Sequence, residues 1–213
     1  MPLPIRRLAI LAVAVGGTAS PLAAQHGSIA VDASIGLSSN SQRHAVSAWY
    51  TVASAWDRVS LDVGLRATSY GGDAGLYNNR GTISATFPNT LSISPGVVGL
   101  NAAVQTSVRL IGPVSAGFNL DLGGVASGAS RTLGSLTATV QTGSLFLGGA
   151  ADLGALNSET YVAVRLTNRF ALRGGTSHYV TNYAVTDPAT PGAPAIRYQK
   201  FVTVPFVAVA FRF

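Results

Sequence analysis

The sequence predicts an all-β fold: a closed antiparallel up-and-down transmembrane β-barrel of eight strands, with ten strands as the alternative. Three observations predict it. Apolar and polar residues alternate with a period of two through most of the chain, as the two faces of a strand require. The connections between alternating segments are short and long in turn. Only 10% of the 213 residues are charged, against 47% that are hydrophobic, and a soluble domain usually carries charge on about a quarter of its residues.

The first 24 residues read as a cleaved signal peptide. Arg6 and Arg7 precede an apolar run over 8–15, and a stretch of small residues ends at Ala24, which is the order of regions in a secretory signal. Glycines interrupt the run well before the roughly 20 apolar residues that a spanning helix needs. We therefore predict export, cleavage after Ala24, and a single barrel domain over 25–213.

Eight segments of the remaining chain alternate as strands do. Within 59–70, for example, Leu61 and Val63 lie on one face while Asp62 and Arg66 lie on the other. The predicted strands are 28–37, 46–53, 59–70, 98–110, 114–122, 160–166, 170–180 and 198–213. The last segment departs from the pattern around Pro205, where Val202, Val204 and Phe206 fall on the mainly polar face.

The connections fall into two classes. The short ones are tight turns at 56–57, 111–113 and 167–169, and the long ones, rich in Gly, Ser, Asn and Pro, are 38–45, 71–97, 123–157 and 181–197. An even number of antiparallel strands with short turns at one end and long loops at the other is typical of an outer-membrane barrel. The segments 82–87 and 136–140 also have strand character, so they either extend the wall outside the membrane or add a fifth hairpin. The three prolines of 181–197 predict a mobile loop without regular pairing.

The charged residues of the predicted strands share one face. A soluble β-sandwich also alternates, but its solvated face would carry Lys and Glu, whereas this face is mostly Ser, Ala, Gly, Thr and Asn, and Lys200 is the only lysine. Small residues suit a narrow bore, and an Arg or Lys facing mid-bilayer lipid costs about 2–4 kcal/mol. The predicted inward-facing charges are Asp32, Asp62, Arg66, Arg109, Asp121, Glu159, Arg165, Arg173, Lys200 and Arg212.

These ten side chains predict a network of ion pairs across the bore. A barrel of eight strands has an interior that side chains can fill, so we expect no continuous water channel. The predicted pairing places Ala163 opposite Arg173 and Glu159 opposite Ser177, with Arg173 near Tyr161 and within reach of a carboxylate on a neighbouring strand. The alternative is that each charge is hydrated separately near an end of the bore.

The end of the chain resembles a known group of proteins. Val207, Val209, Phe211 and the terminal Phe213 alternate, and this pattern looks like the C-terminal signal by which the assembly machinery recognises Gram-negative outer-membrane proteins. Ala208 stands where that signal usually has Gly. Residues 157–175 are similar to the penultimate hairpin of small OmpA-like and OmpX-like barrel domains. The resemblance implies a location in the cell outer membrane, and outer-membrane lipid and the barrel assembly machinery as partners.

The predicted function is a structural or surface-interaction role, in which the long loops meet an extracellular ligand or surface. The alternatives are a narrow, porin-like pore for small solutes or ions, and a lipid-modifying enzyme. Ser177, His178 and Glu159 are the residues that the enzyme would use, but His178 is expected on the face opposite to the other two, so we predict no enzymatic activity. The chain has no cysteine, no clustered metal ligands and no basic run, so we expect no metal, no cofactor and no nucleic-acid partner.

Overall fold

The structure is a computed structural model that describes residues 27–56, 58–145 and 154–213. The predicted signal peptide lies outside these residues. Eight long strands form the wall: β1 (Ile29–Gly36), β2 (Ser41–Ala55), β3 (Val59–Gly72), β6 (Val97–Ile111), β7 (Val114–Gly128), β11 (Ala155–Arg165), β12 (Phe170–Thr186) and β13 (Ile196–Arg212). Five short strands lie toward the other end of the molecule from the tight turns: β4 (Gly75–Asn79), β5 (Thr90–Ile93), β8 (Arg131–Leu133), β9 (Leu136–Val140) and β10 (Gly143–Leu145).

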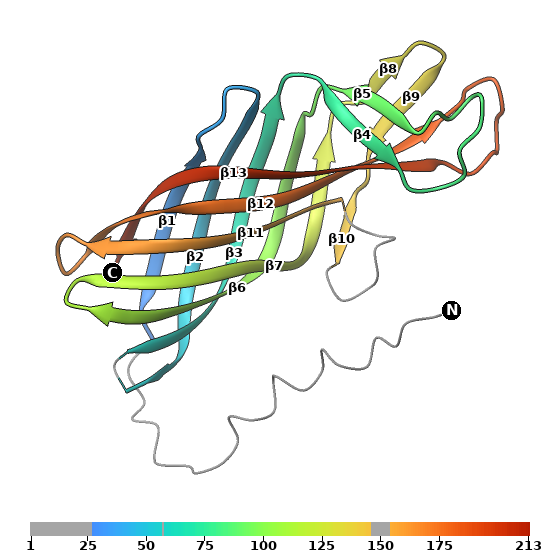
Figure 1. The fold of residues 1–213 in the computed structure, drawn as a ribbon. Helices are drawn as coiled ribbons and strands as arrows, with labels where there is room; N and C mark the ends of the chain where they lie inside the picture. The colour runs from blue at the N-terminus through green and yellow to red at the C-terminus, as the bar shows by residue number, and fades with distance from the viewer. Residues whose placement is uncertain (1–26, 57, 146–153) are drawn as a thin grey trace, which may run out of the picture.

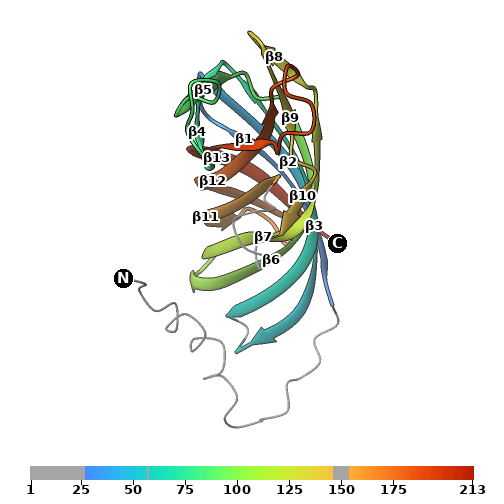
Figure 2. The ribbon, with the colours of Figure 1, turned by 90° about the vertical axis from the view of Figure 1, so that its right-hand side faces the viewer.

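The eight long strands close into a barrel. Each pairs antiparallel with the next, in the order β1-β2-β3-β6-β7-β11-β12-β13. The last strand returns to the first, with Ala30 opposite Arg212 and Gly36 opposite Phe206. Figures 1 and 2 show β1 to β3 on one side of the bore and β11 to β13 on the other. Closure leaves no unpaired edge in the wall, and it confirms the predicted barrel with eight strands rather than ten.

The tight turns gather at one end of the barrel, as predicted. In the β11–β12 turn the backbone N–H groups of Leu166 and Thr167 donate to the Phe170 carbonyl. The Thr167 hydroxyl accepts from the Phe170 N–H at 3.0 Å. The β6–β7 turn uses Gly112 at a φ of 54°, a conformation that glycine adopts without strain. We call this end the short-turn end. In outer-membrane barrels the short turns lie on the periplasmic side.

The wall strands continue further toward the other end than the sequence predicted. β2 begins at Ser41, β7 runs to Gly128, β11 begins at Ala155 and β12 runs to Thr186. The prediction of an unpaired loop over 181–197 was wrong at both ends, since β12 and β13 stay paired up to Val185 and Ile196. The reason is that Tyr183 and Val185 are completely buried, so packing holds these strand ends. The three prolines lie in the remaining connection.

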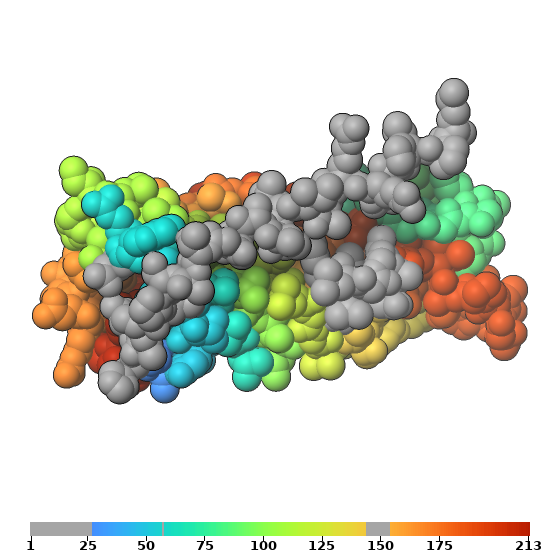
Figure 3. All heavy atoms as spheres, turned by 90° about the horizontal axis from the view of Figure 1, so that it is seen from below, coloured from blue at the N-terminus to red at the C-terminus, as the bar shows by residue number. Residues whose placement is uncertain are grey.

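Two hairpins extend the wall beyond the barrel. β4 pairs with β5 and, through Asn78 and Asn79, with β13. β9 pairs with β8 and with the last residues of β12. We call these four strands the extension. The prediction of strand character was right for 136–140 and wrong for 82–87, where Ile83 is 60% exposed. Figure 3 shows the extension and the short-turn end at opposite ends of an elongated body.

The outer surface of the barrel is apolar. Val63, Leu65 and Val209 are 41%, 59% and 50% exposed, and they belong to the faces that the sequence assigned to lipid. Around Pro205 the inner face of β13 is apolar instead of polar, because Val204 and Phe206, which are only 3% and 1% exposed, pack inside. No helix in the described residues is long and apolar enough to cross a membrane.

Candidate functional site

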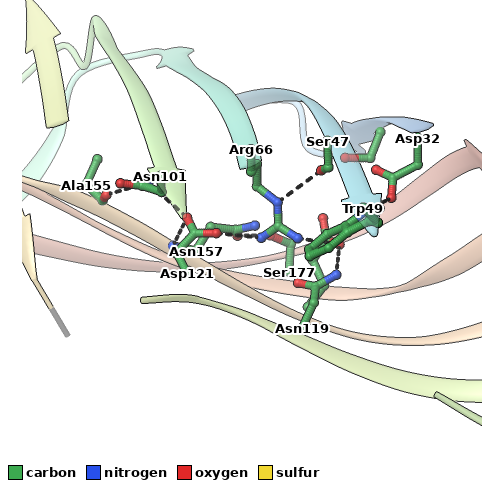
Figure 4. A network of polar contacts seen from close by, with 12 residues as sticks. Asp32, Ser47, Trp49, Arg66, Asn101, Asn119, Asp121, Ala155, Asn157 and Ser177 are labelled. Carbon is green, nitrogen blue, oxygen red and sulfur yellow. Dashed lines mark hydrogen bonds and ion pairs between the residues drawn. The ribbon is translucent and has the colours of Figure 1, made fainter. Parts of the chain in front are cut away.

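Six ionised side chains meet in the middle of the bore. Arg43 of β2, Arg66 of β3 and Arg173 of β12 face carboxylates from β1, β7 and β11. None of the six is more than 6% exposed. We call Asp32, Arg43, Arg66, Asp121, Glu159 and Arg173 the bore network. Figure 4 shows part of it with the amides around it.

Glu159 is the centre of the bore network. Its Oε1 accepts from Arg43, and its Oε2 lies 3.2 Å from an Arg173 nitrogen and 3.6 Å from an Arg66 nitrogen. The Asn119 amide donates to Oε2 at 2.6 Å. Guanidinium groups from three strands of the wall therefore converge on one carboxylate, which ties opposite sides of the barrel together.

Asp121 forms the second part of the bore network. Its Oδ1 accepts from Arg66 at 2.9 Å. Its Oδ2 accepts from the Asn101 amide at 3.0 Å and from the Asn157 backbone N–H at 2.9 Å. Asn101 also donates to the Ala155 carbonyl at 3.1 Å. Both oxygens of this fully buried carboxylate are thus paired, as a buried charge requires.

Asp32 forms the third part, together with aromatic rings. It accepts from Arg173 and from the Trp49 indole N–H at 2.6 Å. The guanidinium carbon of Arg173 lies 3.9 Å from the centre of the Tyr161 ring. Arginines stack on aromatic faces in this way, so Tyr161 and Trp49 close the bore on the side that faces the short-turn end.

The charges of the bore network balance. Three guanidinium groups face three carboxylates, and a buried ion that lacks its partner costs several kcal/mol. The six side chains and the surrounding amides are buried in a barrel whose interior is only wide enough for side chains. The site is therefore a buried cluster of paired charges.

A second layer fills the bore between the network and the extension. Tyr70 and Tyr179 have ring centres 4.6 Å apart, and Tyr77 and Tyr183 meet edge to face at 5.4 Å. The Tyr77 hydroxyl forms a 3.0 Å hydrogen bond with Thr181. All four tyrosines are at most 4% exposed, and burial raises the pKa of Tyr77, which lies in the extension, well above its usual range. This layer was not predicted from the sequence, because Tyr77 belongs to the segment 71–97, which was expected to be a loop.

The structure brings together five of the ten side chains predicted to face the bore as a charged network: Asp32, Arg66, Asp121, Glu159 and Arg173. Asp62 is also buried, but it accepts from Gln105 at 3.0 Å outside the bore network. Arg109, Arg165 and Arg212 are exposed at the short-turn end. Lys200 lies at the other end, with its Nζ 5.9 Å from the centre of the Tyr77 ring.

Arg43 is the functional residue that the sequence reasoning missed. It was assigned to the loop 38–45, yet it lies on β2 and is completely buried, donating to Ser34 at 3.2 Å as well as to Glu159. The signal was present. Val46 and Ala48 are apolar residues at alternate positions of the predicted strand 46–53, which places them on its outer face, and the same alternation continued toward the N-terminus places Ala45 and Arg43 inside.

Ser177 and His178 lie on opposite faces of β12. The Ser177 hydroxyl is buried in the bore and donates to Asn157 at 2.7 Å. His178 lies on the opposite face of β12, where its Nδ1 is 2.8 Å from the Thr203 hydroxyl and its ring stacks on Phe201. Within the described residues no group of three or more His, Asp and Glu side chains is arranged to hold a metal ion.

The residues of the predicted assembly signal lie along the outer face of β13. Val207 and Val209 are 45% and 50% exposed, and Phe213 is 74% exposed. Phe211 packs between Phe170 and Phe213, with ring centres 4.9 and 4.8 Å away. This aromatic row stands at the short-turn end, where a membrane interface favours amphipathic and aromatic rings.

Tyr161 depends on Gly117, which leaves room for its ring. Gly117 of β7 and Gly175 of β12 are its partners in the sheet, and a Cβ at Gly117 would overlap the ring. We expect Gly117→Val to displace Tyr161 from Arg173 and to lower the free energy of unfolding by about 1–3 kcal/mol. Urea unfolding in detergent micelles measures this. Gly174→Val is the control, since a Cβ there meets only the Phe206 carbonyl at 3.7 Å, and an equal loss in both variants would contradict the expectation.

The decisive observation is the combination of closure with an apolar outside and a charged, plugged inside. The chain folds as a closed eight-stranded antiparallel β-barrel with an apolar outer face, which is the architecture of outer-membrane barrels. No protein-family model matches the barrel, and no curated protein matches it either. Among solved structures it is similar to a major outer membrane protein from Thermus thermophilus, at 11% sequence identity and a TM-score of 0.41, over 89% of this chain and 100% of that one.

Proposed function

We propose that this barrel is a non-conducting anchor in the outer membrane of a Gram-negative bacterium, where it holds its extension toward an external partner or surface. The observation that carries the proposal is the blocked bore. Arg43 and Arg66 are completely buried and Glu159 is 2% exposed, and the tyrosine layer stands behind them. Passage of solutes would require both layers to move.

Conductance tests the closed state. We expect the whole protein in planar bilayers to give no steps above the protein-free background, because the bore network spans the bore. Liposomes that carry the protein should not swell in isotonic solutions of small sugars. Swelling or regular current steps would support the narrow pore instead and would overturn the anchor.

The extension supports the interaction half of the proposal. Its strands pair with the ends of β12 and β13, so backbone hydrogen bonds join it to the barrel. Leu76 and Ile83, in the β4 to β5 region, are 63% and 60% exposed, and in this proposal they are the apolar contacts that a partner covers.

Attachment assays test the interaction half. We expect cells that produce Leu76→Ser/Ile83→Ser to attach to surfaces, or to one another, measurably less than cells that produce the native chain. Ala189→Ser/Ala193→Ser in the β12–β13 connection is the matched control. Equal attachment of all three strains would contradict the role of the extension, and mass spectrometry showing a lipid A modified only by the native protein would favour the enzyme.

A further inference from the structure

A cup opens at the short-turn end of the barrel, on the periplasmic side of the bore network. Its volume is about 820 Å³, within the range of small-molecule sites. Its floor consists of Asp32, Trp49, Tyr161 and Arg173, which are held by the contacts of the bore network. The cup therefore ends at the bore network.

The cup is strongly cationic. Arg58, Arg109, Arg165, Arg169 and Arg212 line it and are exposed. In the described residues no ion pair involves any of these five. The carboxylate among the described lining residues is Asp32, which is already bound by Arg173 and Trp49. Asp57, next to Arg58 in the sequence, lies outside the described residues.

The cup and the bore network differ in their balance of charge. There each guanidinium group faces a carboxylate, so the charges balance, whereas the cup gathers five further cations around one cavity. Such a cleft focuses the electric field and raises the local concentration of anions. Hydroxyl groups stand among the arginines, including Ser115 of β7 and Thr167 of the β11–β12 turn, and they add donors that a bound oxyanion accepts from.

We propose that the cup binds phosphate groups. Arginine presents a planar fork that donates two hydrogen bonds to one oxyanion, and the five arginines come from β6, β11, β13 and two turns around the rim. A phosphate has enough oxygens to accept from several of them at once, whereas a carboxylate has only two. The phosphate belongs either to a small phosphorylated solute inside the cup or to a phospholipid headgroup of the periplasmic leaflet at its rim.

Calorimetric titration of the whole refolded protein with inorganic pyrophosphate, in a nonionic detergent, tests the site. We expect Arg109→Gln/Arg165→Gln to weaken binding by about tenfold or more, since each lost charge-assisted hydrogen bond removes a substantial share of the affinity. Arg80→Gln/Arg197→Gln is the matched control, because it removes the same charge at the far end, and it should bind as the native chain does. Heat-modifiable gel mobility shows that each variant is folded.

The same titration in phospholipid nanodiscs distinguishes the two sources. Binding that persists in nanodiscs supports a phosphorylated solute as the occupant. Binding seen in detergent but abolished by the bilayer in the native chain supports lipid headgroups as the occupants. Absence of pyrophosphate binding in detergent, or an equal loss in both double variants, overturns the proposal.

Discussion

Glu159→Gln should destabilise the barrel by about 3–5 kcal/mol, the cost of removing one partner from a buried ion pair. The substitution keeps the size of the side chain but removes the charge on which three guanidinium groups converge. Three buried cations would then face only Asp32 and Asp121, and an amide cannot accept from all the donors left behind. Urea unfolding in detergent micelles, followed by tryptophan fluorescence, measures the loss.

Two further variants make this result specific. Asp73→Asn changes the same charge at an exposed position and should alter the free energy of unfolding by less than about 0.5 kcal/mol. Arg43→Gln/Glu159→Gln removes one charge of each sign and should be more stable than the sum of the single losses predicts, because contacting residues couple. A loss of under about 1 kcal/mol for Glu159→Gln would show that the network is not a stabilising plug.

Val63→Arg should cost about 2–4 kcal/mol if Val63 faces lipid near the middle of the bilayer. Val63 is 41% exposed between Leu61 and Leu65 on the outer face of β3, and a guanidinium group there would lose its hydration without gaining a partner. Unfolding measured after insertion into phospholipid vesicles gives the difference directly.

Ile83→Arg is the matched control for this prediction. Ile83 is 60% exposed between β4 and β5, outside the barrel wall, so the same substitution should have almost no effect. If the two variants were equally stable in vesicles, Val63 would face water, and the placement of the barrel in a membrane would be falsified.

Much of the wall was predictable because alternation is a local property. The parity of each strand follows from its own residues, so the sequence placed Val63 outside and Arg66 inside without knowledge of any partner. The tight turns were predictable for the same reason. The ends of the strands were less predictable, because Arg43, Tyr183 and Val185 lie in segments rich in loop-forming residues. Burial of these side chains against other strands keeps the segments regular.

The pairing within the bore network could not be predicted from the sequence. Asp32, Arg66, Asp121, Glu159 and Arg173 were all expected inside, but nothing in the order of residues showed that Glu159 of β11 meets arginines of β2, β3 and β12. Arg109, Arg165 and Arg212 share the parity of the network, yet they lie at a different height along the bore and line the cup. Height depends on strand stagger and tilt, which closure of the whole sheet determines.

The sequence by itself determined the class of fold and the outward-facing side of each strand, since these depend on a period of two and on the lengths of the connections. Only the tertiary structure decided that eight strands close the wall, which inward-facing charges pair, where the tyrosines close the bore and where exposed arginines gather. The physical reason is that pairing across the bore joins residues up to 141 positions apart, and their distance is set by the register of eight strands together rather than by any one of them.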